Sequence, residues 1–138
     1  MSNLFYRSKN IKEISRLENF VIGSGSDISS NSIINKGVNI GNNFSLGNYS
    51  TIGHSCSIGN NVKIGNNVCL SNAIIGDNVT VSDGAKIGQS GFGFAYDEIN
   101  IIKVFHIGRV IIQNGVKIGT NCAIDRGSFN DTTIGENT

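Results

Sequence analysis

Aliphatic residues recur at every sixth position along much of the chain. The clearest stretch runs from Ile40 to Asn67 and consists of the hexads IGNNFS, LGNYST, IGHSCS and IGNNVK followed by IGNN. The nine regular positions are Ile22, Ile28, Ile34, Ile40, Leu46, Ile52, Ile58, Ile64 and Leu70. Six residues turn an α-helix by about 1.7 turns and would scatter these side chains around it. A fixed period of six is instead typical of a parallel β-helix.

Each hexad predicts one short strand followed by one bend. Alternation along a strand points the repeat aliphatic residue and the residue two places before it to the same, inner face. Gly or Asn falls three places after many repeat positions, and both residue types tolerate a positive φ angle. These predicted left-handed positions are Asn43, Asn61, Asn67, Asn78, Gly84, Gly115, Asn121 and Asn137. Three hexads would form one triangular coil, so each repeat residue should stack on the one eighteen positions away, with strands about 4.8 Å apart.

The first twenty residues lie outside the repeat, and we assign residues 21–138 to the β-helix. Asn10 and Glu13 have the spacing of a capping box, and three aliphatic residues follow at helical spacing: Ile11, Ile14 and Leu17. This pattern predicts a short amphipathic helix within residues 1–20. Such a helix would cap the first coil, whose strand edges would otherwise be open.

Three irregularities interrupt the repeat. One spacing shortens to five residues, between Leu70 and Ile75, which a turn can absorb. The segment from Gly88 to His106 has no period of six and contains four of the ten aromatic residues, so it predicts a loop inserted at one corner. After it we expect inward positions at Ile107, Ile112, Ile118, Ile124 and Ile134, with a second small break at SFND before the last of these.

Composition excludes several classes of function. The net charge of +1 gives no electrostatic footprint for nucleic acid, and three cysteines without a C-x-x-C motif give no zinc site. Cys56 and Cys122 occupy inward positions and are predicted to be small core residues. No apolar run reaches the roughly 18 residues of a membrane span and no signal peptide precedes the repeat, so we expect a cytoplasmic protein.

The chain offers few candidates for proton transfer. Of its two histidines, His54 lies two places after a repeat position and is predicted to be exposed at a turn. His106 ends the insertion and is expected either to pack beside Phe105 or to face solvent. Neither has a carboxylate at local spacing that could orient it, so neither is assigned as a general base.

Two short motifs are stronger candidates for binding. The segment from Ser90 to Phe94, SGFGF, combines glycines that allow close backbone approach with two apolar rings. It either folds on the wall of the solenoid or forms an apolar wall for an acyl chain or its carrier arm. The motif IDRG places Asp125 where most hexads have Gly. Arg126 beside it either forms an ion pair or recognises a phosphate or sugar hydroxyl.

The stretch GFGFAYD followed by IGRVIIQNGVKIGTNCAIDRGSFNDTTIG resembles the UDP-3-O-(3-hydroxyacyl)glucosamine N-acyltransferase family of lipid A biosynthesis. The resemblance runs from about Gly88 to the end. It implies a left-handed parallel β-helix and a homotrimer with active sites between subunits. It also implies transfer of a 3-hydroxyacyl group from acyl carrier protein to the 2-amino group of a UDP-linked 3-O-acylglucosamine. The donor carries phosphopantetheine, and no metal or redox cofactor is implied.

On this resemblance, the substrate-binding candidates are Gly91, Phe92, Gly93, Phe94, Asp125 and Arg126. The family's catalytic histidine would fall beyond Thr138, and some twenty residues before Ile22 are too few for its uridine-binding domain. We therefore assign no catalytic residue and expect no turnover from these 138 residues alone. Two alternatives share the hexads: another sugar O- or N-acyltransferase or acetyltransferase of the hexapeptide class, and a non-catalytic solenoid.

Overall fold

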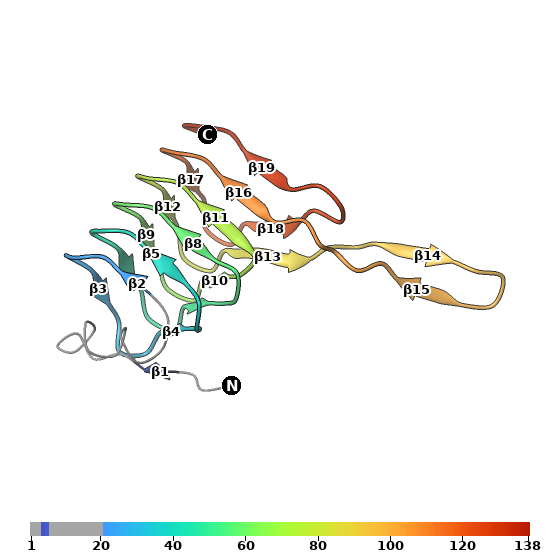
Figure 1. The fold of residues 1–138 in the computed structure, drawn as a ribbon, viewed down its shortest axis with the longest axis horizontal. Helices are drawn as coiled ribbons and strands as arrows, with labels where there is room; N and C mark the ends of the chain where they lie inside the picture. Colours follow the sequence, from blue (N-terminus) through green and yellow to red (C-terminus); the bar gives the residue numbers. More distant parts are fainter. Residues whose placement is uncertain (1–3, 6–20) are drawn as a thin grey trace.

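The computed structural model describes residues 4–5 and 21–138, which form a parallel β-solenoid with one projecting hairpin (Figure 1). Three sheets run along the solenoid, and each coil contributes one strand to each sheet. The first sheet contains β1 (Leu4–Phe5), β4 (Ile33–Ile34), β7 (Thr51–Ile52), β10 (Cys69–Leu70), β13 (Lys86–Ser90) and β18 (Ala123–Arg126). The second contains β2 (Val21–Ile22), β5 (Asn39–Ile40), β8 (Ser57–Ile58), β11 (Ala73–Ile75), β16 (Val110–Ile112) and β19 (Thr132–Ile134). The third contains β3 (Asp27–Ile28), β6 (Ser45–Leu46), β9 (Lys63–Ile64), β12 (Thr80–Val81) and β17 (Lys117–Ile118).

The register confirms that repeat residues stack on one another. Ile22 pairs with Ile40, and Ile40 pairs with Ile58, eighteen residues further on in each case. The short spacing before Ile75 is absorbed without loss of pairing, because Ile58 pairs with Ile75. Beyond the insertion the stack continues with Ile75 paired to Ile112.

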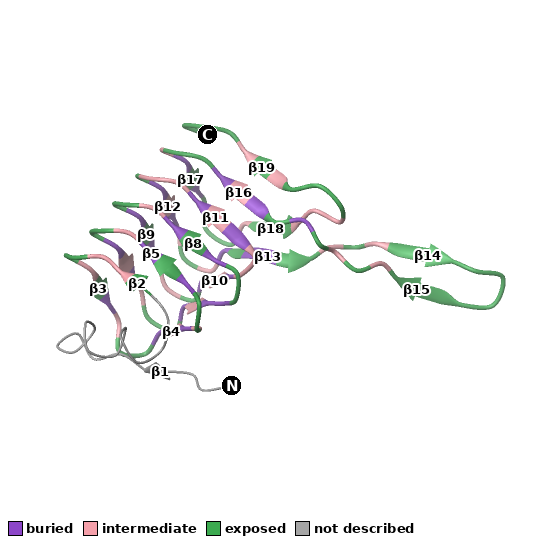
Figure 2. Ribbon diagram, in the orientation of Figure 1, coloured by how far each residue is buried: buried purple, intermediate pink, exposed green. Residues whose placement is uncertain are grey.

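The repeat side chains line one continuous core between the three sheets. In Figure 2, buried positions alternate with intermediate or exposed ones along most strands of the solenoid. Positions two residues before the repeat aliphatics are also buried, including Val38, Val62 and Val68. Burying one such side chain is worth roughly 1.5–3 kcal/mol. Phe44 occupies one of these otherwise small positions and is only 1% exposed.

Ile107 was predicted to point inward, and this is wrong. Its side chain is 67% exposed, and its backbone N–H donates to the carbonyl oxygen of Ser128 over 2.8 Å. The solenoid resumes instead with β16, whose Val110 and Ile112 are buried. Ile107 is followed by Gly, as in most hexads, but it lies five residues before Ile112 rather than six, on the segment that returns from the hairpin.

The eight predicted left-handed turn positions are all confirmed. Their φ angles are positive, from 54° at Asn67 to 76° at Gly84. Two non-glycine residues without an amide side chain, Tyr49 and Ser55, adopt the same conformation at the equivalent position of their hexads. The turn geometry is therefore set by the coil, and Asn and Gly are the residues that adopt it at lowest cost.

Turn side chains join successive coils by a second set of hydrogen bonds. In one column, each side-chain oxygen accepts the backbone N–H of the coil before it, over 2.7–2.9 Å. The members of this column are Ser24, Asn42, Asn60, Asp77 and Asn114. The column satisfies backbone donors at a corner where the sheets have ended.

The N-terminal helix expected within residues 1–20 falls on positions outside the described residues, apart from β1. This strand pairs antiparallel with β4, with Leu4 opposite Ile34 and Phe5 opposite Ile33. No helix long and apolar enough to cross a bilayer occurs among residues 4–5 and 21–138.

Cys56 is a core residue, as predicted, and its ionisation should couple to folding. Burial raises the pKa of its thiol from 9.0 to about 11. The unfolded chain would lose this proton near pH 9, whereas the folded chain would keep it until about pH 11. The free energy of unfolding should therefore be insensitive to this group below pH 9. Between pH 9 and 11 it should fall by about 1.4 kcal/mol per pH unit at most.

Urea unfolding at pH 8, 9 and 10.5 would measure this loss, with Cys56→Ala as the matched variant. The stability difference between the two proteins should shrink as pH rises, because the variant has no thiol to ionise. A constant difference over this range would contradict the coupling.

Candidate functional site

A β-bulge marks the point where the chain leaves the solenoid. Ile87 of β13 lies opposite Ile124 of β18, but the next pair in register is Ser90 with Arg126. Strand β13 therefore holds one extra residue, and Gly88 within it has a φ of 84°. Bulges bend a strand and redirect the residues that follow, and this one leads into the SGFGF motif.

The predicted insertion is a β-hairpin rather than an unstructured loop. Strand β14 (Phe94–Tyr96) pairs antiparallel with β15 (Ile101–Lys103), and Figure 1 shows both extending away from the coils. Every residue of the two strands is exposed, including the large apolar side chains of Tyr96 and Ile101 (Figure 2). An isolated two-stranded hairpin is marginally stable in water, and exposed apolar side chains gathered in this way are typical of an interaction surface.

At the base of the hairpin the structure brings together three of the six predicted binding residues and one histidine. A Cβ placed on Gly91 would lie 3.2 Å from Asp125 Oδ2 and 3.5 Å from His106 Nε2. A Cβ on Gly93 would lie 3.0 Å from His106 Cε1 and 3.6 Å from Nε2. We call Gly91, Gly93, His106 and Asp125 the hairpin base. The two motifs meet here because β13 and β18 are neighbours in one sheet.

His106 is half-buried, and its ring is held by the backbone of Val104. Its Nδ1 lies 3.1 Å from the carbonyl oxygen of Val104. A carbonyl oxygen can only accept, so Nδ1 carries the proton and donates it. In the neutral imidazole Nε2 is then the unprotonated acceptor. The sequence alone showed no carboxylate near His106. Asp125 lies nineteen positions after it and comes close to it only through the pairing of β13 with β18.

Phe92 and Phe94, the two aromatic residues of the SGFGF motif, are both exposed. Their rings form an edge-to-face pair with centroids 5.2 Å apart, and Phe92 is 97% exposed while Phe94 is 40% exposed. Of the two alternatives for the SGFGF segment, the structure excludes folding of both rings on the solenoid wall. An apolar wall for an acyl chain remains a prediction.

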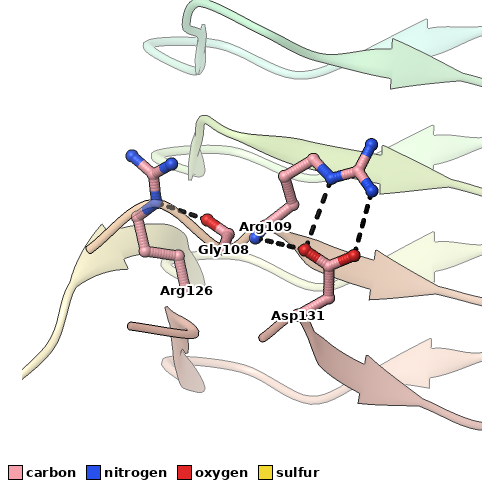
Figure 3. Close-up of polar contacts among 4 residues, drawn as sticks. All are labelled: Gly108, Arg109, Arg126 and Asp131. Atoms are coloured by element: carbon pink, nitrogen blue, oxygen red, sulfur yellow. Dashed lines mark hydrogen bonds and ion pairs between the residues drawn. The ribbon is translucent and has the colours of Figure 1, made fainter. Parts of the chain in front are cut away.

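Arg126 bonds to backbone rather than to a carboxylate. Its Nε donates to the carbonyl oxygen of Gly108 over 2.6 Å, which joins β18 to the segment returning from the hairpin (Figure 3). Among the residues that the structure describes, no ion pair or hydrogen bond involves its two terminal nitrogens. They are available to an anionic ligand.

The ion pair at this corner joins Arg109 and Asp131, which sequence reasoning did not identify. The Arg109 backbone N–H and Nε both donate to Asp131 Oδ1, over 2.7 and 3.3 Å, while the terminal nitrogen donates to Oδ2 over 3.0 Å (Figure 3). The sequence feature that could have indicated this pair is the SFND break. Its last residue, Asp131, bonds to Arg109, which lies 22 positions earlier. The Arg109 guanidinium lowers the pKa of the Asp131 carboxyl, chiefly through the side-chain hydrogen bonds.

We expect the Arg109–Asp131 pair to stabilise the corner at neutral pH and to lose this effect in acid. The lowered pKa means that the contribution is present above the unfolded pKa of Asp, about 3.9, and is lost as pH falls through the folded pKa. Asp131→Asn should remove it while keeping an oxygen that can accept the Arg109 N–H. Thermal unfolding from pH 6 to pH 3 should show the two proteins converging as the pH falls. Parallel curves would mean that the charge contributes nothing.

Other predicted features lie apart from this corner. His54 is exposed at a turn, as expected, and Cys122 is partly buried against the core. In the described part of the chain, no three His, Cys, Asp or Glu side chains come close enough to hold a metal ion.

Comparison with known proteins agrees with this architecture. Residues 37–72 match the family described as bacterial transferase hexapeptide (six repeats). The repeat and the three-sheet coil together confirm the predicted left-handed parallel β-helix.

Curated relatives match part of the chain. UDP-3-O-acylglucosamine N-acyltransferase of Rhizobium rhizogenes is 58% identical over 55 residues, which are 40% of this chain and 16% of the relative. The enzyme of the same name from Agrobacterium fabrum is 54% identical over 55 residues, with the same two coverages. The resemblance predicted from the motifs is thus confirmed as a partial one, since the match spans about a sixth of each relative's length.

Among solved structures, serine acetyltransferase 1 from Entamoeba histolytica is similar at a TM-score of 0.43 and 20% identity. That similarity covers 94% of this chain and 44% of the other.

Proposed function

We propose that this chain is part of a hexapeptide-repeat N-acyltransferase acting on a UDP-linked 3-O-acylglucosamine. The observation that carries the proposal is the 58% identity over 55 residues to enzymes of that name. In the reaction the 2-amino nitrogen attacks the thioester carbonyl of a 3-hydroxyacyl group. A C–N bond forms, the C–S bond breaks, and the amine loses one proton as the carrier thiol is released.

The proposed donor is acyl carrier protein bearing the acyl group on phosphopantetheine, and the reaction needs no metal or redox cofactor. Phe92 and Phe94 offer an exposed apolar surface for the acyl chain or its arm, which is the role predicted for SGFGF. Arg126 has terminal nitrogens suited to a phosphate of the donor arm or of the nucleotide. Gly91 and Gly93 let the backbone approach the substrate closely.

The proposed assembly is a homotrimer with each site between two subunits. The supporting feature is the hairpin, because it projects from the chain's own coils and every residue of β14 and β15 is exposed (Figure 2). Covering them with a second subunit would place Phe92 and Phe94 at a subunit boundary. Residues of both chains could then line one acyl-binding cleft.

A chimera tests the activity. Residues 88–138 would replace the corresponding segment of the Rhizobium rhizogenes relative, and products would be identified by mass spectrometry. With 3-hydroxyacyl carrier protein and the UDP-sugar, the chimera should form the N-acylated product. Arg126→Ala in the chimera should reduce the rate, whereas Lys117→Ala on the third sheet should not.

Two results would overturn the proposal. One is a folded chimera that is inactive with the hydroxyacyl donor. The other is a chimera that transfers acetyl groups from acetyl-CoA in preference, which would favour an acetyltransferase of the same repeat class.

A further inference from the structure

Many of the turns that join successive coils share one pattern of two hydrogen bonds. At the turn of Asn60 and Asn61, the Asn42 N–H donates to Asn60 Oδ1 over 2.8 Å. The Asn61 N–H donates to the carbonyl oxygen of the same Asn42 over 2.9 Å. One backbone residue of the preceding coil therefore holds both a turn side chain and the N–H of the residue after it. We call this pair of bonds the coil clamp.

In the described part of the chain the coil clamp occurs at six turns. The clamped pairs are Asn42–Asn43, Asn60–Asn61, Asn66–Asn67, Asp77–Asn78, Asp83–Gly84 and Asn114–Gly115. In the last pair, Asn114 Oδ1 accepts the Asp77 N–H over 2.8 Å, and the Gly115 N–H donates to the Asp77 carbonyl oxygen over 2.9 Å. This clamp closes the coil that carries the hairpin, because 37 positions separate Asp77 from Asn114.

The two groups that the clamp holds are the reactants of one spontaneous reaction of Asn. The backbone nitrogen of the next residue attacks the side-chain carbonyl carbon, Cγ, and loses its proton to water. A C–N bond forms to close a cyclic imide, the bond from Cγ to the side-chain nitrogen breaks, and ammonia leaves. Water then opens the imide at either carbonyl and yields Asp or isoaspartate. A side chain on the next residue hinders the attack, so glycine in that place allows it most readily.

Asn114 and Gly115 form the one Asn-Gly pair of the 138-residue sequence. Asn114 is exposed to water, so solvent reaches the reacting groups in the folded chain. The clamp nevertheless keeps them apart. The electron pair left on the Gly115 nitrogen after loss of its proton would lie along the former N–H direction, toward the Asp77 carbonyl oxygen rather than Asn114 Cγ. The bond from the Asp77 N–H fixes the carboxamide in the same arrangement.

We propose that Asn114–Gly115 is a deamidation site that the coil clamp holds unreactive, so that Asn114 is converted only when this turn opens. Local opening would break both bonds to Asp77 and free the backbone to close the imide. The reaction consumes only water. This inference is independent of the proposed acyl transfer, because it rests on the turn geometry alone.

The two products have different consequences for the coil. Asp at position 114 keeps an Oδ1 that can accept the Asp77 N–H. Asp77 and Asp83 already serve in this way in their own clamps, accepting over 2.7 and 2.8 Å. In isoaspartate the backbone runs through the former side chain, which inserts one methylene between β16 and β17 and removes that acceptor. The isoaspartate form should therefore lose the clamp that closes the hairpin coil, whereas the Asp form should keep it.

Mass spectrometry of the intact chain after incubation tests the proposal. The protein would be held in mildly alkaline buffer with and without urea and then cut with trypsin. Cleavage after Arg109 and Lys117 releases a peptide in which Asn114 is the one Asn. In urea this peptide should gain the mass of an NH2-to-OH exchange before any other Asn-containing peptide. In native buffer the same conversion should be roughly tenfold slower or more, because the turn must first open.

Two variants sharpen the test. Gly115→Asn recreates the Asn-Asn pair found at Asn42 and Asn43, where the second residue adopts a φ of 55°. It should fold and should resist conversion at position 114 even in urea. Asn114→Asp reproduces the Asp product and should unfold at the same urea concentration as the parent. The isoaspartate form, separated by chromatography and identified by fragmentation, should unfold at a lower one.

The proposal is overturned if Asn114 is converted as fast in native buffer as in urea, or if another Asn is converted first in urea. Equal urea midpoints for the isoaspartate form and Asn114→Asp would overturn the predicted loss of the clamp. If Gly115→Asn does not fold, the comparison of the parent with and without urea still decides whether the clamp protects Asn114.

Discussion

Replacing Gly88 with alanine is expected to destabilise the protein by about 3 kcal/mol or more, one of the two largest effects we predict. The residue has a φ of 84°, which strains any side chain, and the new Cβ would lie 1.6 Å from the carbonyl oxygen of Ser71. That oxygen belongs to the backbone of the preceding coil and cannot swing aside. Relief would require opening of the bulge that joins β13 to the hairpin.

Equilibrium unfolding in urea would measure the loss, with Gly119→Ala as the control because its φ is ordinary and its surroundings are open. The control should stay within about 1 kcal/mol of the parent. Equal stability of the two variants would mean that the bulge tolerates a side chain. The close approach of the Gly88 and Ser71 backbones would then not be a requirement of the fold.

Phe44→Ala is expected to cost about 3–5 kcal/mol, the usual range for a fully buried aromatic side chain. Phe44 is 1% exposed and occupies an inward position that most coils fill with a smaller residue. Its loss would leave a cavity in the core between the three sheets. The chain should unfold at a clearly lower urea concentration.

Tyr49→Ala serves as the matched control. This aromatic residue lies one turn further along the same coil but is 69% exposed. Its removal should change stability by no more than about 1 kcal/mol. A similar loss in both variants would show that burial does not decide the cost.

The period of six predicted the parts of the fold that repeat. Spacing fixed the inward positions, and Gly or Asn at a constant offset fixed the turns, because both depend on residues within one hexad. Ile107 shows where this reasoning ends. It matches the repeat locally, but its direction depends on the bulge at Gly88 and on the return path of the hairpin.

The sequence predicted most residues of the candidate site but not how they lie relative to one another. SGFGF and IDRG contributed Gly91, Gly93 and Asp125, yet the histidine that joins them seemed to have no carboxylate partner. The pairing of β13 with β18, at a 37-residue offset, brings Asp125 near His106 without a hydrogen bond between them. The Arg109–Asp131 pair depends in the same way on a corner that the repeat does not describe.

The column of hydrogen-bonded turn residues has a mechanical consequence. Each coil is bonded to the one before it through backbone and through Asn or Asp side chains, so a force applied at the C-terminus would detach one coil at a time. Most steps would release 17 or 18 residues, the offsets between bonded turns. The coil that carries the hairpin joins Asp77 to Asn114, 37 positions apart. Its release would lengthen the chain by about twice the ordinary step, which marks the position of the hairpin in a force–extension trace.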